Sequence, residues 1–409
     1  MSNFILNEGY QQNKENLFNK GKGDLIFVDK KKYIDLSFCA GANLLGHNTS
    51  INKKILRKYL NKNISNFAAP NIYAYNYAKT LKYLLPQFSK FIFCNSGSEA
   101  IVKTIRICRS LNNKKKIINV SGSWHGSVDQ FLFTKNIFKQ KPLSAGLPRE
   151  IQKDLVTIPY NEFDESLSLL NKYKKNICCI IIEPIQGCLP TYKSLKYLKM
   201  LEKFSKENKI TLVFDEMITG LRTGGSSLQN NYKIKTDLST FGKAFCGGLP
   251  MGIIGLTKNI ENKLKKNKLP VYFGGTYSGN SLCTFFGNEY LQYVIKNKKI
   301  IFKNLENKSI DFYDQINNFI NKNNLDLSIF RFHSMIRIIF SKKKIVNRYQ
   351  RDFFEKKYLN KIKMFKNFLY LNNIYYPNNG IIFLSNSSKK KNIEHVIKKI
   401  KEGFLKYFK

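Results

Sequence analysis

Between residues 90 and 257 the chain alternates short apolar runs with longer amphipathic stretches. The apolar runs are rich in isoleucine, valine and phenylalanine, which is typical of strands buried on both faces. These runs are FIFC (91–94), IINV (117–120), ICCIII (177–182), TLVF (211–214) and GIIGL (252–256). The stretches between them, such as residues 98–111 and 194–208, have helical spacing. Repeated strand–helix–strand units predict an α/β fold whose central sheet is mostly parallel and covered by helices.

The two ends of the chain have a different pattern. Residues 25–38 (LIFVDKKKYIDLSF) predict a hairpin or a strand pair. Beyond about residue 300, strand patterns and a helical pattern alternate, at 334–341, 353–371 and 380–385. We therefore expect a large ligand-binding domain over residues 56–295. A smaller α+β lobe is expected to form from residues 1–55 and 296–409 together.

Polar and glycine-rich residues directly follow the predicted strands. They form the segments NSGSEA (95–100), SGSWHG (121–126), EPIQG (183–187) and DEMITG (215–220). In open parallel sheets, ligands bind beyond the carboxyl ends of the strands, which share one edge of the sheet. The sequence therefore predicts that these segments meet at one ligand-binding site.

The first two segments each have an ordinary explanation beside a functional one. Gly97 and Ser98 lie where a strand passes into a helix, and the free N–H groups of a helix start favour an anion such as phosphate. Ser96 or Ser98 could equally be an ordinary helix N-cap. Trp124, the single tryptophan of the chain, and His125 follow the next strand. A flat aromatic side chain there can stack on a heteroaromatic ring or pack in the core.

Two carboxylates and one lysine complete the candidate site. Asp215 and Glu183 each end an apolar strand, where a buried carboxylate needs a cationic partner. A protonated pyridine nitrogen would serve, as would a nearby lysine or arginine. Lys243 lies in FGKAFCGGLPMG (241–252), among glycines and apolar residues, and poor hydration lowers the pKa of such a lysine. A phosphate-binding turn, a stacking aromatic, a buried aspartate and a nucleophilic lysine are together the components of a pyridoxal phosphate (PLP) site.

Composition excludes several other classes of protein. The net charge is +41, but the lysines are spread along the whole chain and no nucleic-acid-binding motif is present, so we expect no specific nucleic-acid partner. The eight cysteines form no C-x-x-C pair, so we expect reduced thiols and no metal site. No segment has the apolar length that a membrane span or a signal peptide needs, so we expect a cytoplasmic protein.

In its motifs the chain resembles the class III PLP-dependent aminotransferases, most closely the group similar to glutamate-1-semialdehyde 2,1-aminomutase. The resemblance rests on FCNSGSEAIVKTIRICR, GSWHGSVDQFL, IIEPIQG, the stretch from Leu212 to Leu256, and GGTYSGNSL. It covers residues 20–290 and is weaker beyond them. It implies the fold type I of PLP-dependent transferases and a homodimer with active sites at the subunit interface.

Carried over residue by residue, the resemblance makes Lys243 the lysine that forms a Schiff base with PLP. Asp215 becomes the partner of the pyridine nitrogen, and Gly97 and Ser98 bind the phosphate. Trp124 takes the stacking position, where the family usually has tyrosine or phenylalanine.

Four further positions complete the implied site. His125, Glu183 and Met217 line the cofactor, with Met217 standing where valine is usual. Thr276, in GGTYSGN, matches the threonine that reaches the phosphate of the neighbouring subunit. The resemblance thus implies a cofactor held by two chains.

Two substrate-facing features of the aminomutase are missing. The aminomutase has an N-terminal arginine in a segment like SPVRAF, whereas no arginine precedes Arg57 here and the family position falls near Leu6. It also has a glutamate in a stretch like SPFEAGFLS, whereas the matching residues 375–385 (YYPNNGIIFLS) contain no acid. Arg331 and Arg337, in FRFHSMIRIIFS, could instead bind an anionic substrate, or could be surface charges.

These observations predict a cytoplasmic, PLP-dependent enzyme that moves an amino group between an amine or amino-acid donor and an aldehyde or ketone acceptor. The intramolecular glutamate-1-semialdehyde aminomutase is the alternative within the family. A basic binding protein on a degenerate aminotransferase scaffold is the alternative outside it. The presence of both Lys243 and Asp215 argues against the last, because an inactive site would be free to lose them.

Overall fold

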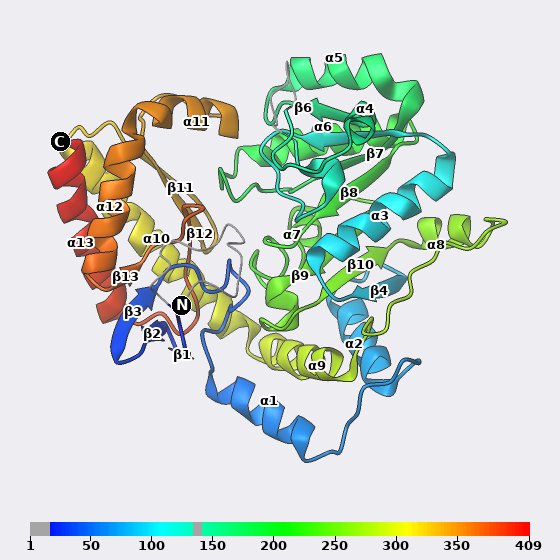
Figure 1. The fold of residues 1–409 in the computed structure, drawn as a ribbon, viewed down its shortest axis with the longest axis horizontal. Coiled ribbons are helices and arrows are strands. Elements are labelled where there is room, and N and C mark those ends of the chain that lie inside the picture. Colours follow the sequence, from blue (N-terminus) through cyan, green and yellow to red (C-terminus); the bar gives the residue numbers. More distant parts are fainter. Residues whose placement is uncertain (1–16, 134–140) are drawn as a thin grey trace.

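One β-sheet, here called the central sheet, forms the core of the fold. The computed structural model describes residues 17–133 and 141–409, and in these ranges the central sheet has seven strands in the order β4-β10-β9-β8-β7-β5-β6 (Figure 1). They are β4 (Lys90–Cys94), β5 (Lys116–Val120), β6 (Leu155–Ile158), β7 (Ile177–Ile182), β8 (Thr211–Asp215), β9 (Leu238–Gly242) and β10 (Gly252–Leu256). Strand β10 runs antiparallel to β4 and β9, and the other pairs in this sheet are parallel. The expected mostly parallel sheet is therefore confirmed.

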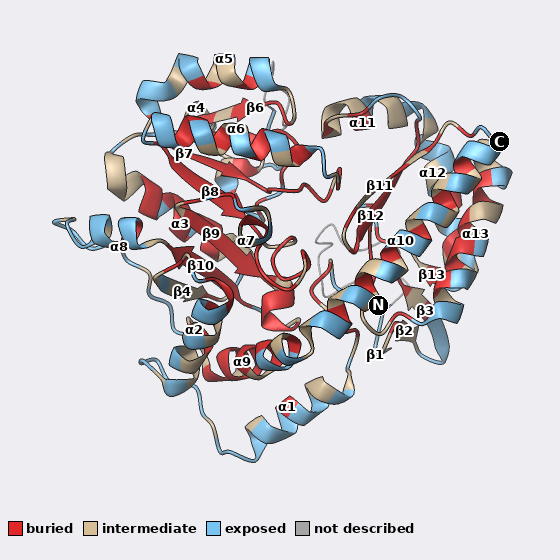
Figure 2. Cartoon of the chain, turned by 180° about the vertical axis from the view of Figure 1, so that it is seen from behind, coloured by how far each residue is buried: buried red, intermediate tan, exposed pale blue. Residues whose placement is uncertain are grey.

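Helices cover both faces of the central sheet (Figures 1 and 2). They and their neighbours are α1 (Ser50–Leu60), α2 (Ile72–Leu84), α3 (Gly97–Asn112), α4 (Arg149–Lys153), α5 (Phe163–Tyr173), α6 (Ser194–Glu207), α7 (Leu228–Tyr232), α8 (Lys258–Leu264) and α9 (Ser281–Lys296). Ile180 of β7 lies in a core cluster with Leu198 of α6, whereas Ile181 lies in a different cluster with Ile105 of α3. Successive side chains of a strand point to opposite faces, so a strand covered on both faces must be apolar throughout.

Two smaller sheets are built from the ends of the chain. In the described ranges the sheet here called the hairpin sheet has the order β1-β2-β3-β13, and the one called the small sheet has the order β11-β12-β14. Their strands are β1 (Lys20–Lys22), β2 (Leu25–Val28), β3 (Lys31–Asp35), β11 (Ser328–Phe332), β12 (Met335–Ile339), β13 (Ile374–Tyr375) and β14 (Ile381–Phe383). Strands β2 and β3 form the expected antiparallel pair, and β13 joins β3 in parallel. The N-terminal hairpin thus shares a sheet with a strand from near the C-terminus.

The remaining helices pack on these two sheets. They are α10 (Lys298–Lys322), α11 (Arg348–Glu355), α12 (Leu359–Leu371) and α13 (Lys390–Phe408). One core cluster joins Leu36 with Phe312 of α10, Phe365 of α12 and Val396 of α13. The expected division into domains at residues 56–295 stays a prediction, although the two chain ends do pack together.

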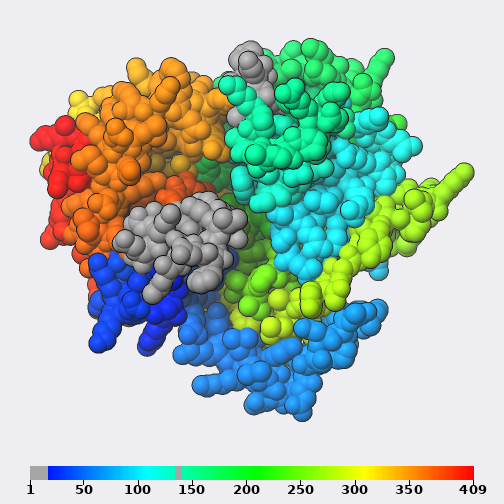
Figure 3. All heavy atoms as spheres, viewed as in Figure 1, coloured from blue at the N-terminus to red at the C-terminus, as the bar shows by residue number. Residues whose placement is uncertain are grey.

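The two faces of the small sheet have different partners. Ile336 and Ile382 pack in the cluster of α10, α12 and α13, whereas Met335 and Ile381 pack in a cluster with the central sheet. Arg337 is directly opposite Ile381 in the β12–β14 ladder and so belongs to the face turned toward the central sheet. Figure 3 shows the C-terminal part (orange) abutting the part that contains the central sheet (cyan to green).

Three details differ from the sequence pattern. Strand β6 was not predicted, because its run LVTI is short and contains a polar threonine. The helical stretch predicted at 353–371 is divided between α11 and α12 by a 3₁₀ turn at Lys356–Tyr358. Further 3₁₀ turns lie at Asp129–Phe131, Lys174–Asn176 and Lys243–Cys246.

None of the helices in the described ranges combines the length and the apolar character that crossing a bilayer requires.

Candidate active site

Asp215 lies at the end of β8 and is held by several hydrogen bonds. Its side chain is buried, and Nδ1 of His125 donates to its Oδ2 at 2.8 Å. Its Oδ1 accepts from Oγ1 of Thr240 at 3.0 Å and from the backbone N–H of Met217 at 3.2 Å. The His125 ring is also buried, packs edge-on against Phe131, and has no partner for its Nε2 among the described residues. The arrangement fixes the orientation of the carboxylate.

Lys243 is the first residue after β9 and has an unusual backbone conformation. Its φ of 46° lies in the left-handed region, which non-glycine residues rarely adopt and which concentrates at functional sites. A Cβ at the preceding Gly242 would lie 2.7 Å from Met217 Sδ and 2.8 Å from the carbonyl oxygen of Met251, so only glycine fits there. The close approach of β9 to Met217 brings Lys243 beside the end of β8.

The electrostatic surroundings of Lys243 favour a neutral amine. Burial lowers the pKa of Lys243, and the positive charge of Arg222 acts in the same direction. Glu183, Asp215 and Cys39 raise the pKa, but they do not outweigh the loss of hydration. In the described part of the chain the Lys243 amine has no hydrogen-bond or ion-pair partner.

Glu183 joins two of the loops that follow the strands. It is buried at the end of β7, and its Oε1 accepts a short hydrogen bond from the backbone N–H of Trp124. Its Oε2 accepts from the N–H of Gly187 at 3.4 Å. The side chain of Trp124 is 48% exposed, so the alternative of core packing is wrong for this residue. The indole is available to a ligand at the strand ends.

The start of α3 offers unpaired hydrogen-bond donors. Ser96 is the N-cap, because its side chain accepts from the N–H of Glu99 at 3.1 Å. Oγ of Ser98 accepts from the N–H of Ser127 at 3.0 Å. The backbone N–H groups of Gly97 and Ser98 have no acceptor among the described residues. Free N–H groups at a helix start can bind an anion.

Thr276 lies apart from this group. It is exposed in a turn, and a Cβ on the neighbouring Gly275 would be 3.7 Å from Oε1 of Glu99, near the start of α3. Within the described ranges its side chain makes no hydrogen bond. The structure therefore brings together Asp215, His125, Glu183 and Lys243, but leaves Thr276 on the surface. The position near Leu6 falls outside the described residues.

The two candidate substrate arginines have different environments. Nη1 of Arg331 donates to Oε1 of Glu306 at 2.6 Å and to Oγ of Ser309 at 3.1 Å, so Arg331 is part of an ion pair. Arg337 has no such carboxylate partner in the part of the chain that the structure describes.

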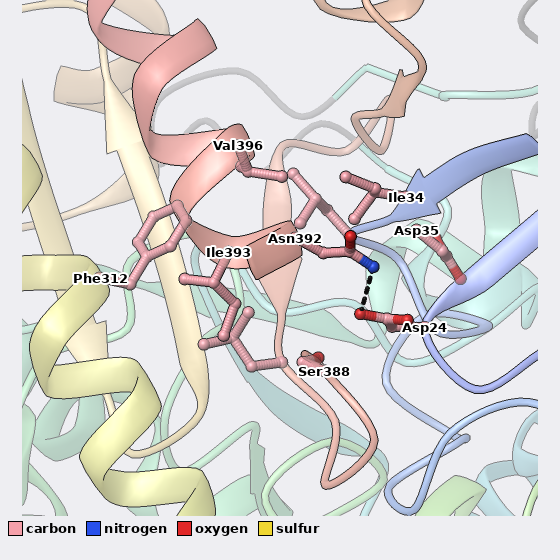
Figure 4. A pocket seen from close by; sticks show the side chains of 10 residues that line it. Asp24, Ile34, Asp35, Phe312, Ser388, Asn392, Ile393 and Val396 are labelled. Atoms are coloured by element: carbon pink, nitrogen blue, oxygen red, sulfur yellow. Dashed lines mark hydrogen bonds between the residues drawn. The ribbon is translucent and has the colours of Figure 1, made fainter. Parts of the chain in front are cut away.

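An internal cavity lies elsewhere in the molecule (Figure 4). It measures about 10 Å³ and lies between the hairpin sheet, α10 and α13, where Nδ2 of Asn392 donates to Oδ2 of Asp24 at 2.9 Å. None of the predicted site residues lines it. It has room for one water molecule at most and is not a cofactor site.

The chain matches the family model "Aminotransferase class-III" over residues 8–360. The chain belongs to the class III aminotransferases. A glutamate-1-semialdehyde 2,1-aminomutase of Wigglesworthia glossinidia brevipalpis is 35% identical over 309 residues, which are 73% of this chain and 67% of the relative. Among solved structures, an omega-transaminase from Sphaerobacter thermophilus has a TM-score of 0.85 at 19% identity, covering 95% of this chain and 90% of the other. A transaminase with PLP bound has a TM-score of 0.84 at 18% identity, covering 97% and 93%.

The residues of this class III aminotransferase fit the PLP on which its family depends. The unpaired N–H groups of Gly97 and Ser98 are available to a phosphate, and the exposed Trp124 is available to an aromatic ring. Asp215 is buried with hydrogen bonds to each oxygen and can face a protonated ring nitrogen. The amine of Lys243, which has no partner among the described residues, is free to react with an aldehyde. Across the described ranges, by contrast, no group of acidic, histidine or cysteine side chains is placed to hold a metal ion.

Several residues around the site were not predicted. Thr240 donates a hydrogen bond to Asp215. No sequence signal marks this threonine, because its role depends on its position opposite the end of the neighbouring strand. Arg222 is fully buried and donates to the carbonyl oxygens of Gly41 and Leu384 and to Oγ of Ser334. Burial lowers the pKa of Arg222 to about 10. Its partners are far apart in the sequence, so no local pattern could have indicated that this arginine ties the chain ends to the site.

Proposed function

We propose that this class III enzyme moves an amino group between an amine or amino-acid donor and an aldehyde or ketone acceptor. Lys243 would be its catalytic lysine and Asp215 the partner of the ring nitrogen. The observation that carries the proposal is the poorly hydrated Lys243 amine, which has Glu183 and Asp215 as its negatively charged neighbours. The family supplies the cofactor, and these residues supply the groups that the cofactor needs.

Lys243 would act as nucleophile and as general acid–base. Its lowered pKa leaves more of the neutral amine near neutral pH, and the neutral amine is the form that attacks a carbonyl carbon or accepts a proton. When bound, PLP supplies an electron-withdrawing ring that stabilises negative charge on the amine-bearing carbon. Nζ of Lys243 would take the proton from that carbon and return it on the cofactor side.

Asp215 would hold a proton on the ring nitrogen. Thr240 and the N–H of Met217 fix its Oδ1, and His125 fixes its Oδ2. These three donors fix the orientation of the carboxylate, so that it could accept a hydrogen bond from a protonated ring nitrogen that faces it. His125 would thus orient Asp215, while Glu183 holds the loop that carries Trp124.

We further propose a homodimer in which Thr276 completes the phosphate site of the partner. Large apolar side chains are exposed around the turn that contains Thr276, namely Phe67, Ile72, Tyr75, Tyr272 and Tyr277. The start of α2 adjoins the turn that contains Thr276, because Nδ2 of Asn71 donates to the carbonyl oxygen of Gly279 at 3.0 Å. Tyr272 is 74% exposed, and an apolar surface of this kind marks a protein interface.

Intramolecular transfer, the aminomutase reaction, is the second candidate. It is favoured by similarity to a glutamate-1-semialdehyde 2,1-aminomutase that is 35% identical over 73% of this chain. Against it stand the absence of any arginine before Arg57 and the glycine, Gly380, in the stretch that carries a glutamate in the aminomutase. We therefore expect intermolecular transfer to be the efficient reaction.

One experiment separates these reactions. The purified enzyme with PLP is mixed with a panel of amines and amino acids while its visible absorbance is recorded, and glutamate-1-semialdehyde is supplied separately without a donor. Intermolecular transfer predicts that a donor bleaches the visible band and that a carbonyl acceptor restores it. Rapid formation of 5-aminolevulinate without added donor would instead establish the aminomutase.

A further inference from the structure

Arg337 is a buried cation whose hydrogen-bonding capacity is mostly unused. It projects from β12 toward the central sheet and is 8% exposed. A guanidinium has five N–H groups, yet the carbonyl oxygen of Asn379, 2.6 Å from Nη1, is its one acceptor within the described ranges. Its Nε is buried without any partner there. Unused donors on a buried charge are costly and call for an explanation.

Gly380 makes room for this guanidinium. Its φ is +73°, and a Cβ added to it would lie 3.0 Å from Nη2 of Arg337. Any side chain at residue 380 would therefore compete with the guanidinium for the same space. The glycine at residue 380 and the buried position of the Arg337 guanidinium are thus coupled in space.

The neighbours of Arg337 add positive charge rather than neutralise it. Burial lowers the pKa of Arg337 to about 10, and repulsion by Arg351 acts in the same direction. Burial, followed by repulsion from Arg337 and Arg351, lowers the pKa of Lys366 to about 8. Glu355 is the nearby acid, but it lies 3.4 Å from Nε of Arg351 and also accepts from the N–H of Phe340. The acid is therefore already engaged by other groups.

This basic cluster adjoins the loops of the active site. Nη1 of Arg351 donates to the carbonyl oxygen of Cys188 at 3.1 Å. Cys188 follows the EPIQG segment that begins at Glu183, and its Sγ contacts Oε1 of Gln186 at 3.2 Å. Nε2 of Gln186 donates to the carbonyl oxygen of Ser121, in the loop that carries Trp124. Ile381, directly opposite Arg337 in the β12–β14 ladder, lies against Gly187 of the EPIQG segment, because a Cβ on this glycine would be 2.6 Å from Cδ1 of Ile381. Arg337 therefore lies on the face of the small sheet that meets this loop.

We propose that Arg337 binds a carboxylate of the substrate and so selects acidic amines and oxo acids. The inference rests on the proposed amino transfer and names its substrate class. Arg331, the other candidate, is excluded from this role by its ion pair with Glu306. A carboxylate can accept two N–H groups of one guanidinium, and such charge-assisted pairs are strong in a poorly hydrated site.

The test uses the PLP-bound enzyme and three variants. Arg337→Met removes the charge at similar length, Arg337→Lys keeps a charge without the paired donors, and Arg331→Met is the matched control on the neighbouring strand. Each is assayed with 4-aminobutyrate against butylamine and with β-alanine against propylamine. Binding of glutarate, an unreactive dicarboxylate, is measured by calorimetry with 1,5-pentanediol as its neutral counterpart.

The expected result is a loss that falls mainly on acidic ligands. Arg337→Met should raise the KM for 4-aminobutyrate and β-alanine, and the Kd for glutarate, by about 10- to 100-fold, which is the effect of losing a hydrogen-bonded charge. The kcat/KM for the uncharged amines should fall far less than that for the acidic ones, and Arg337→Lys should fall between the unaltered enzyme and Arg337→Met. Arg331→Met should lower the unfolding midpoint without changing this preference.

Two results would overturn the proposal. Equal losses for charged and uncharged amines in Arg337→Met would make Arg337 a structural support of the turn at 377–380. Absence of glutarate binding to the unaltered enzyme would remove the anion site altogether. If uncharged amines react and glutarate does not bind, the substrate class is wrong and amino transfer stands. If glutarate binding depends on Arg337 and no amine reacts, the anion site stands and amino transfer fails.

Discussion

Lys243 should be the residue on which all catalysis depends. Lys243→Ala removes the amine that attacks the carbonyl and moves the proton, so turnover should fall to the background of the assay while PLP still binds. Borohydride reduction of the unaltered enzyme followed by peptide mapping should place the label on Lys243. Lys235→Ala, at an exposed lysine near the site in sequence, should keep full activity. Label on another lysine would contradict the assignment.

Asp215 should matter more for chemistry than for folding. Asp215→Asn keeps an oxygen for the N–H of Met217 but loses the negative charge that holds a proton on the ring nitrogen. We expect kcat to fall by about 10²- to 10⁴-fold, a range typical for losing an acid–base group, with a small change in the unfolding midpoint. Steady-state kinetics and urea unfolding check this together. Near-normal turnover would show that Asp215 only supports the loop.

At the single-residue level, position could be predicted and environment could not. Asp215, Glu183 and Lys243 were proposed because each interrupts or follows a strongly apolar strand, a signal carried by adjacent residues, and the structure places them near one another. The partners of Glu183 were not, because the N–H of Trp124 belongs to a loop 59 residues away. The choice between Arg331 and Arg337 also depends on remote groups, Glu306 for one and Gly380 for the other.

Among the elements, the strands that both faces bury were the easiest to predict. Strand β7 is apolar throughout because α6 and α3 cover its two sides. Strand β6 was not predicted, because Thr157 interrupts its short apolar run. The antiparallel direction of β10 has no signal of its own in GIIGL. Direction is set by the connection through the Lys243 turn, which is a property of the assembled sheet.

The contact between α10 and the small sheet should depend on pH. Burial would raise the pKa of Glu306, but hydrogen bonds and charges from His333 and Arg331 outweigh it and hold the pKa at about 2. A lowered carboxylate pKa contributes stability above the unfolded value of about 4.3, and this contribution is lost as pH falls through about 2. Glu306→Gln should therefore lower the free energy of unfolding by about 1–3 kcal/mol at pH 7.

The pH dependence of the unfolding free energy of Glu306→Gln provides an internal control. Urea unfolding of Glu306→Gln and of the unaltered chain should converge as pH falls from about 5 toward 2, because the carboxyl group is then neutral in both. Glu289→Gln, which removes a more exposed pair with Lys58, should cost less than about 1 kcal/mol. A difference for Glu306→Gln that is independent of pH would show that packing, and not charge, is responsible.

For the whole molecule, net charge and exposed apolar surface act in opposite directions. A charge of +41 on each chain opposes association, but salt screens charges beyond about 8 Å at physiological ionic strength. The exposed apolar side chains around Thr276, and Leu269 in the segment after α8 that projects from the body in Figures 1 and 3, offer apolar contact area. We therefore expect a dimer that becomes weaker at low salt.

Thr276→Ala should separate association from cofactor binding. The turn at Thr276 lies beside exposed apolar side chains, and in the proposed dimer its unpaired hydroxyl would complete a phosphate site that Gly97 and Ser98 of the partner begin. The variant should remain dimeric by light scattering but bind PLP about 10-fold more weakly, the effect of losing one charge-assisted hydrogen bond. Tyr75→Glu combined with Tyr272→Glu should instead give a monomer with weak PLP binding. Thr191→Ala, in a turn outside this surface, should change neither measurement. A monomeric chain that holds PLP tightly and turns over normally would contradict the shared site, because a single subunit would then supply every phosphate ligand itself.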